Sequence, residues 1–327
     1  MKRVFIISIV FLVSLNLIAI TRAWLFTTNE RKLDDEARKN FVGSFVRTKI
    51  GTIRYILDGK ENFPLVLFVG GLTTEGTDYF ERPAEEFKKA GYRTLRYDLV
   101  GRGGSERSKE FEYNSATYLL QIDELLKSLN IDGPIYLVGQ SLGGGIVADW
   151  AGVHPDRVLA ISIHGSAGYA PDSELVVSIL RIPLVGEYLF WLFRKELTLG
   201  RVRAHFASDQ PDEVIRFEQS IRRSAAFEGY YNAIFQTIKN FGATNLENVF
   251  LQLRKTDFPI QIIWGEDDRI LPVEGAHVIN DWLGGKAEVV SVPNVGHMVM
   301  IEGGNRTISI VIEFFNKVRL KASSNKG

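Results

Sequence analysis

One segment near the middle of the chain restricts the possible folds more than any other. The apolar run at residues 135–138 leads directly into Gly139-Gln140-Ser141-Leu142-Gly143, and a glycine-rich, mostly apolar stretch follows as far as His154. This order predicts a buried strand, a sharp turn and a helix. Glycines on both sides of the serine remove the side chains that would collide in such a turn. The segment therefore predicts a strand–turn–helix unit in which Ser141 projects from the start of the helix.

The rest of the chain alternates short strand-like runs with helical patterns, the order expected of a mostly parallel sheet flanked by helices. Residues 44–50 and 52–57, joined at Gly51, predict an opening antiparallel pair. The further expected strands are residues 65–69, 92–99, 134–139, 158–163, 260–264 and 288–292. Helices are expected at residues 83–90, at 118–129 with Asn114 or Ser115 as the cap, after Ser141 as far as His154, and at 307–318.

A long insertion interrupts this alternation. Between Gly165 and Asp257 the strand-like runs give way to amphipathic stretches at residues 174–180, 185–193, 212–223 and 227–241. A helical insertion between two strands predicts a cap over the carboxyl ends of the sheet, where open α/β sheets bind ligands. The apolar run 185–193 fits a helix that lines an apolar pocket or touches lipid, and equally one that packs on the core.

The charge balance and residue usage exclude several classes of protein. Lys and Arg total 39, as do Asp and Glu, so the formal net charge is zero and no nucleic-acid partner is expected. The chain has no cysteine, which excludes disulfides, thiolate metal sites and a cysteine nucleophile. The glycines around Ser141 lack the Lys-Ser/Thr ending of a phosphate loop, and no metal motif occurs. No cofactor and no metal are therefore expected.

The N-terminal segment has the composition of a targeting signal. Met1-Lys2-Arg3 precedes an apolar run over residues 4–20. This order predicts a signal peptide or a retained transmembrane anchor over residues 1–26. It follows that the folded domain is expected to be exported or membrane-anchored outside the cytoplasm, in a periplasmic, extracellular or lumenal space. Small residues at Thr21 and Ala23 leave cleavage and retention equally open, and a polar spacer is expected at residues 27–43.

A serine hydroxyl is a poor nucleophile without a neighbouring base, so the pattern around Ser141 requires a histidine. Of the five histidines, His297 follows the last expected strand and precedes the final helix, which returns it to the sheet edge beside the serine. His164, at the end of a central strand, is the remaining alternative. The other histidines are expected to be structural (His154), in the cap (His205) and on a surface helix (His277).

The carboxylate that orients the histidine should end a strand between the serine and the histidine. Glu266-Asp267-Asp268 supplies three adjacent acids there. The order serine, acid, histidine, the turn around Ser141, this acidic turn after Gly265, and Gly296-His297 together resemble the α/β-hydrolase superfamily. The resemblance covers residues 44–318. In the family's pattern the acid is the last residue of the Gly-x-x-Asp turn, which falls on Asp268, with Asp267 and Glu266 as alternatives.

Two further motifs carry the resemblance. Residues 97–105 resemble the family's Asp-x-x-Gly-x-Gly-x-Ser loop, which implies a structural role for Asp98. Gly70-Gly71-Leu72 stands where the family commonly has His-Gly-x. The last residue of that motif donates one backbone N–H to the oxyanion hole, here Leu72, and the residue after the nucleophile, Leu142, donates the other. Gly70 departs from the usual histidine.

The resemblance implies an α/β fold with a mostly parallel eight-stranded α/β-hydrolase sheet flanked by helices. A helical cap is inserted before the strand that carries the catalytic acid. The expected domains are a core in two parts, residues 44–168 and 257–320, a cap at residues 169–256 and a polar tail at residues 321–327.

The activity implied is that of a serine carboxylesterase or lipase, with Ser141 as nucleophile, His297 as base and Asp268 as the orienting acid. The expected partner is a small-molecule or lipid ester, in the sharpest form a lipophilic acyl ester, with membrane association through the N-terminal segment. A carbon–carbon bond hydrolase, an aminopeptidase or a perhydrolase of the same fold, and a non-catalytic binding protein, are the alternatives.

Overall fold

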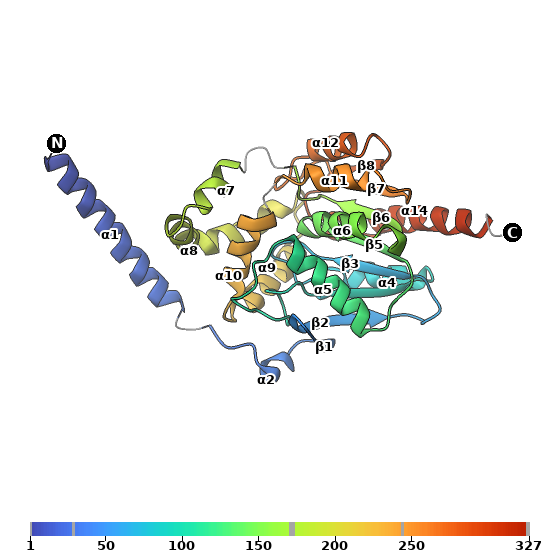
Figure 1. The fold of residues 1–327 in the computed structure, drawn as a ribbon, viewed down its shortest axis with the longest axis horizontal. Coiled ribbons are helices and arrows are strands. Elements are labelled where there is room, and N and C mark those ends of the chain that lie inside the picture. The colour runs from blue at the N-terminus through green and yellow to red at the C-terminus, as the bar shows by residue number, and fades with distance from the viewer. Residues whose placement is uncertain (1, 28–29, 170–173, 243–244, 325–327) are drawn as a thin grey trace.

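The computed structural model describes residues 2–27, 30–169, 174–242 and 245–324. An eight-stranded sheet with the order β1-β2-β4-β3-β5-β6-β7-β8 forms its centre (Figure 1). The strands are β1 (Ser44–Thr48), β2 (Gly51–Asp58), β3 (Leu65–Val69), β4 (Arg93–Tyr97), β5 (Ile135–Gln140), β6 (Val158–His164), β7 (Ile260–Gly265) and β8 (Glu288–Val292). The β1–β2 and β2–β4 pairs are antiparallel and the other neighbouring pairs are parallel. The predicted mostly parallel eight-stranded sheet is confirmed.

Helices cover both faces of the sheet. The core on one face includes residues of α5 (Ser115–Ser128), α6 (Leu142–Val153), α11 (Glu247–Leu253) and α12 (Glu274–Trp282), and that on the other includes residues of α4 (Glu81–Lys89) and α14 (Gly304–Ser324). On the second face the ring of Phe87 lies 5.3 Å from that of Phe68 and 6.0 Å from that of Phe315. The central strands are buried on both faces, which explains why they read as continuous apolar runs.

Element ends differ from the sequence expectations by a few residues. Asn114 caps α5, because its side chain accepts a hydrogen bond from the Thr117 N–H at 3.1 Å. The last helix, α14, extends beyond the predicted 307–318 at both ends and runs through much of the predicted polar tail. The remainder of that tail, residues 325–327, lies outside the described residues.

The insertion between β6 and β7 is helical, as expected. It contains α7 (Glu174–Leu180), α8 (Val185–Thr198), the 3-10 helix η3 (Val202–His205), α9 (Pro211–Ala225), α10 (Tyr230–Thr237) and the π-helix η4 (Ile238–Gly242). Figure 1 shows α7 to α10 gathered to one side of the sheet, opposite the end of α14. Hydrogen bonds from Gly103 to Ser224, at 2.8 Å, and from Arg102 to Thr237, at 2.9 Å, join these helices to the loop after β4.

The predicted domain boundaries stay a prediction, and parts of the predicted cap, residues 170–173 and 243–244, lie outside the described residues. The helix α11 falls inside the predicted cap range of residues 169–256 but packs with the core. Its Phe250 ring stacks on Trp282 of α12, with ring centroids 6.0 Å apart.

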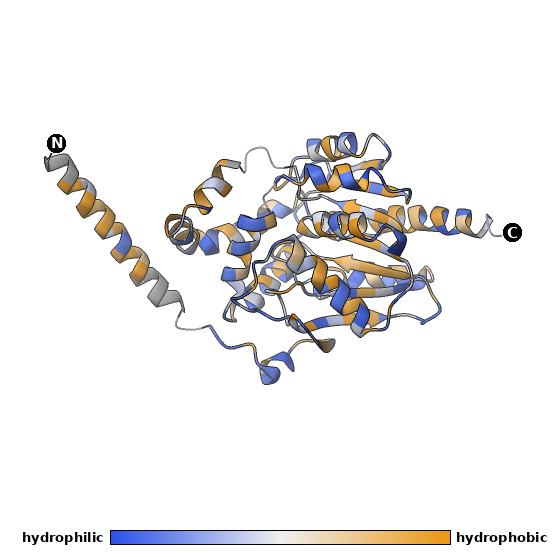
Figure 2. Cartoon of the chain, viewed as in Figure 1, coloured by the Kyte–Doolittle hydropathy of each residue, from blue (hydrophilic) through white to orange (hydrophobic). Residues whose placement is uncertain are grey.

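The N-terminal helix α1 (Lys2–Thr27) stands apart from the sheet beside α8 (Figure 1). The Tyr188 hydroxyl of α8 donates a hydrogen bond to the Leu15 carbonyl oxygen at 2.5 Å. Between residues 6 and 20 the apolar side chains of α1 are mostly exposed, as the orange of Figure 2 indicates. Among the described residues, no helix combines the length and the hydropathy needed to cross a membrane.

The segment after α1 is packed against the rest of the molecule. Arg31 exchanges backbone hydrogen bonds with the cap, donating to Ala226 and accepting from Glu228, both at 2.9 Å. The short helix α2 (Asp35–Arg38) follows, and Arg38 and Phe41 are buried. The described part of the predicted polar spacer therefore contacts both the cap and the core and connects them.

Candidate active site

Ser141 occupies the sharp turn between β5 and α6. Its backbone has φ +56° and ψ −119°, a conformation that residues other than glycine rarely adopt. The turn is possible because the residues two positions before and after Ser141 are glycines, which have no side chain to collide with their neighbours. A Cβ on Gly143 would lie 2.1 Å from the Val69 carbonyl oxygen, and one on Gly139 would lie 2.4 Å from that of Gly143. The predicted strand–turn–helix is confirmed, and Ser141 is half-buried at the start of α6.

Asp268 and His297 form a hydrogen-bonded pair. The distance between Nδ1 of His297 and Oδ2 of Asp268 is 2.7 Å, and both residues are buried. The other oxygen of Asp268 accepts the N–H groups of Ile270 and Leu271, at 2.8 and 2.9 Å. The carboxylate is therefore held by the turn that follows β7. A carboxylate can only accept, so Nδ1 of His297 carries the proton and Nε2 presents a lone pair.

From the sequence, any of three adjacent acids could orient His297, and their positions in the structure distinguish them. Glu266 and Asp267 are exposed, whereas Asp268 is buried against His297. Asp268 is thus the acid that reaches the histidine.

The loop that carries His297 is tied to the turn that carries Ser141. Gln140, the residue before Ser141, donates from Nε2 to the His297 carbonyl oxygen at 2.7 Å. The Tyr79 hydroxyl in turn donates to Oε1 of Gln140 at 3.2 Å. The candidate serine, acid and histidine therefore all lie at the carboxyl edge of β5, β7 and β8, on turns that are joined by hydrogen bonds.

The other histidines are placed differently. His164 is fully buried, its Nε2 lies 2.8 Å from the Ser162 hydroxyl, and burial lowers its pKa to about 3. His154 ends α6 against the Trp150 ring, and His277 is exposed on α12. His205, expected only to lie in the cap, brings its ring to within 5.5 Å of the His297 ring. No periodicity or motif in the sequence marks that contact.

The two predicted oxyanion donors flank Ser141. Among the described residues, no hydrogen-bond acceptor takes the N–H of Leu72 or of Leu142. The Leu72 loop runs beside the serine, since a Cβ on Gly71 would lie 3.3 Å from the Ser141 Cβ. Buried Arg102 fixes this loop by donating from Nε to the Leu72 carbonyl oxygen at 2.9 Å. Two unused N–H groups beside a serine are suited to receiving a developing negative charge.

Asp98 has the structural role expected of it. Its carboxylate accepts the N–H groups of Thr77 and Gly104, at 3.1 and 3.0 Å, and pairs with Arg54 at 3.0 Å. It is completely buried and holds together the loops after β3 and β4.

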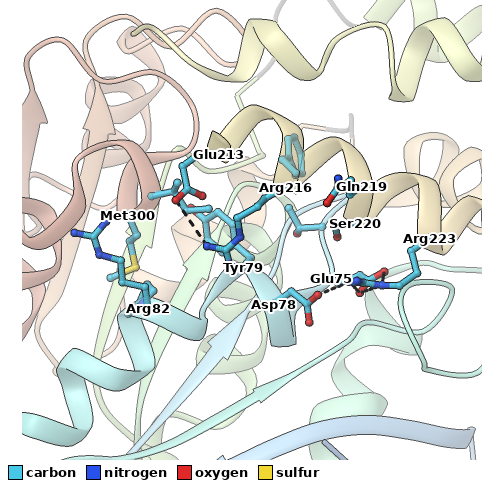
Figure 3. Close-up of a pocket in the computed structure, with 14 residues that line it drawn as sticks. Glu75, Asp78, Tyr79, Arg82, Glu213, Arg216, Gln219, Ser220, Arg223 and Met300 are labelled. Carbon is cyan, nitrogen blue, oxygen red and sulfur yellow. Dashed lines mark hydrogen bonds and ion pairs between the residues drawn. The ribbon is translucent and has the colours of Figure 1, made fainter. Parts of the chain in front are cut away.

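A cavity of about 160 Å³ lies near this site between the core and the cap (Figure 3). Charged side chains of α3 (Gly76–Tyr79), α4 and α9 line it, together with Tyr79 and with Met300 of α13 (Val299–Glu302). At one end Glu75 contacts Arg223 and accepts from the Ser224 hydroxyl at 2.9 Å. Burial, reinforced by the Asp98 carboxylate, raises the pKa of Glu75 to about 7. Neither Ser141 nor His297 lines this cavity.

A family model described as the alpha/beta hydrolase fold matches residues 64–304. The chain belongs to the alpha/beta hydrolase fold family. It is accordingly a hydrolase enzyme, and the predicted membership is confirmed. The match runs from the end of the loop before β3 to the first residue of α14, so it includes every element of the candidate site.

Known alpha/beta hydrolases resemble this one over most of its length. A 2-hydroxy-6-oxo-6-(2'-aminophenyl)hexa-2,4-dienoic acid hydrolase from Metapseudomonas resinovorans is 26% identical over 88% of this chain and 95% of its own. A monoacylglycerol lipase from Mus musculus is 23% identical over 68% of this chain and 67% of its own. The crystal structure of a membrane phospholipase A, a bacterial virulence factor, superimposes with a TM-score of 0.68 at 23% identity. It covers 98% of this chain and 99% of that one.

Proposed function

We propose that the protein is a serine hydrolase that cleaves a carboxylic ester, in particular a lipophilic acyl ester, through an acyl-enzyme. The observation that carries the proposal is the buried Asp268–His297 pair, with its 2.7 Å hydrogen bond, tied to the turn that bears Ser141. This arrangement fits a catalytic triad in which serine is the nucleophile, histidine is the base and aspartate orients the histidine.

The reaction follows from these positions. His297 takes the proton of Ser141 at Nε2 while the hydroxyl oxygen attacks the ester carbonyl carbon, and Asp268 stabilises the imidazolium that forms. The N–H groups of Leu72 and Leu142 receive the oxyanion. His297 then gives the proton to the departing alcohol, and water, activated by the same histidine, hydrolyses the acyl-enzyme and releases the acid.

The preference for a lipophilic acyl group rests on the cap and on the relatives. In the apolar run 185–193, Phe190 is buried against Phe235, with rings 5.2 Å apart, whereas Phe193 is half exposed. One part of the helix therefore packs inside the cap, and another presents apolar surface. The monoacylglycerol lipase among the relatives acts, by its name, on an ester that carries one acyl chain.

Carbon–carbon bond hydrolysis is a second candidate. It is favoured by the relative from Metapseudomonas resinovorans, which is named for a substrate of that class and which this chain matches over 95% of its length. The same Ser141, His297 and Asp268 would serve either reaction, so only substrates distinguish them.

The test uses the full chain in mild detergent, p-nitrophenyl esters from acetate to palmitate, and an aryl-substituted 2-hydroxy-6-oxo-dienoate. Wild-type protein is expected to hydrolyse the esters, fastest at a medium or long chain. Ser141→Ala is expected to lower kcat by roughly 10⁴-fold or more, because the nucleophile is removed. Turnover of the dienoate alone would replace the ester proposal with the carbon–carbon one. Ester hydrolysis that survives in Ser141→Ala would overturn both.

We further propose that residues 1–26 direct export, which places the hydrolase outside the cytoplasm in contact with a membrane. The support is the basic start and the apolar run of the N-terminal segment, together with apolar side chains exposed on α1 and on the cap helix beside it.

A further inference from the structure

The cap segment 205–208 is joined closely to the loop that carries His297. The Met298 N–H donates to the His205 carbonyl oxygen at 3.2 Å. A Cβ on Gly296 would lie 2.8 Å from that oxygen and 2.7 Å from the Ala207 nitrogen, so only glycine allows this approach. The backbone of His205 is therefore fixed relative to His297.

The Glu302 carboxylate completes the joint. One of its oxygens accepts the Gly296 N–H and the other accepts the Ser208 N–H, each at 2.6 Å. The loop residue before His297 and the cap residues after His205 thus share one charged acceptor.

The hydrogen bonds of the His205 ring determine its tautomer. Nδ1 lies 2.9 Å from the Arg201 carbonyl oxygen, which can only accept, so Nδ1 carries the proton. Burial, with a smaller contribution from His297, lowers the pKa of His205 to about 4, so the ring is neutral at neutral pH. Nε2 consequently presents a lone pair. No described group donates a hydrogen bond to it, and the residue is only half-buried.

The position of His205 relates this lone pair to one part of the substrate. In the proposed reaction His297 protonates the departing alcohol oxygen, so the alcohol portion of the ester must lie against His297. The His205 ring meets the His297 ring edge to face at 5.5 Å and the Phe217 ring at 5.1 Å. The His205 ring, which carries this acceptor, therefore lies next to the place that the leaving alcohol must take.

We propose that Nε2 of His205 accepts a hydrogen bond from a free hydroxyl group on the alcohol portion of the substrate. The favoured substrates are then esters of polyhydric alcohols, such as glycerol, over esters of simple alkanols. This inference rests on the proposed serine esterase function, and it makes His205 a residue that determines specificity.

The test compares 1-octanoylglycerol with propyl octanoate, which share the acyl chain and a three-carbon alcohol and differ in the hydroxyl groups. Full-length wild-type protein is expected to show a kcat/KM roughly 3- to 10-fold higher for the glycerol ester, the worth of one hydrogen bond in a partly open site. His205→Phe is expected to abolish this preference, because it slows the glycerol ester far more than the propyl ester. His277→Phe, a change at an exposed histidine on α12, is the matched control and is expected to keep the preference.

Equal kcat/KM values for the two esters in the active wild-type protein would overturn the inference, and that comparison needs no variant. It would also be overturned if His205→Phe lowered both values by the same factor, because a structural role would act on both esters alike. His205→Leu, which also lacks an acceptor but is smaller, replaces the phenylalanine variant if that variant does not fold. Failure of the proposed function has a different signature: neither ester is cleaved, or cleavage persists in Ser141→Ala.

Discussion

At the scale of single residues, Glu75 is a buried carboxyl group at the junction of core and cap, and its ionisation affects the stability of the fold. Its side chain is completely buried, and it contacts Arg54 at 3.3 Å, Arg223 and the Ser224 hydroxyl. Burial and the nearby Asp98 carboxylate raise its pKa to about 7, against 4.5 for a free glutamate. The folded protein therefore holds a proton at Glu75 over a pH range in which the unfolded chain has lost it.

This difference sets the sign of a pH dependence. Between pH 4.5 and about 7 the folded state binds more protons at Glu75 than the unfolded state, so the free energy of unfolding falls as the pH rises. Glu75→Gln lacks this group. The unfolding free energy of wild-type protein minus that of Glu75→Gln is expected to decrease from pH 5 to pH 8 and to level off beyond. Denaturant titrations at several pH values measure it, and a difference that is flat or rises with pH would contradict the raised pKa.

At the scale of secondary-structure elements, short contacts between α13 and the cap couple parts of the chain that are far apart in sequence. Glu302 accepts hydrogen bonds from Gly296 in the His297 loop and from Ala207 and Ser208 in the cap. Because these donors bind one carboxylate, a charged group fixes the position of the cap relative to the His297 loop.

Replacing that carboxylate by an amide is expected to loosen the joint. In Glu302→Gln an NH₂ group must face backbone N–H donors, so hydrogen bonds worth about 1.5–3 kcal/mol each with a charged acceptor are lost. We expect kcat for a good ester to fall about tenfold with little change in KM, since the base loses its position while the binding surface remains. The exposed Glu313 on α14 supplies the control, Glu313→Gln. Steady-state kinetics and thermal unfolding of both variants test the expectation, which fails if the two behave alike.

These elements also mark what the sequence can and cannot predict. The apolar runs of β3 and β5 predict strands because each is buried on both faces and so needs no polar residue. The turn around Ser141 is predictable because its geometry tolerates few residues other than glycine beside it. Contacts such as Glu302–Ser208 join residues 94 positions apart, and nothing local in either segment encodes them. The His205–His297 contact is hidden for the same reason.

At the scale of the whole molecule, apolar surface is concentrated on the side that bears α1. Figure 2 shows much orange on the middle part of α1 and on α7 and α8 of the cap. The exposed apolar residues of the cap there are Leu175, Val176, Ile182, Leu184, Val185, Phe193 and Leu197. Exposed apolar surface of this extent is typical of a face that meets another molecule or a lipid layer. The apolar side of the cap therefore lies next to the N-terminal helix, which agrees with the proposed export to a membrane.

That proposal gives a prediction for the whole chain. Full-length protein expressed in a bacterial host is expected in the membrane or periplasmic fraction, accessible to protease added outside the cytoplasm, and protein lacking residues 1–26 in the cytoplasmic fraction. Leu12→Arg is expected to act like the deletion, because a charge inside an apolar targeting segment costs about 2.5–3.5 kcal/mol on insertion scales. Ser14→Ala, a change without charge in the same run, is the control and should be exported normally.

The length of the exported chain then separates the two alternatives for this segment, since cleavage shortens the chain and an anchor leaves it whole. Full-length protein that stays in the cytoplasm would overturn the export proposal. It would leave the assignment of the site unaffected, because Ser141, Asp268 and His297 lie in turns after β5, β7 and β8 and none of them is part of α1.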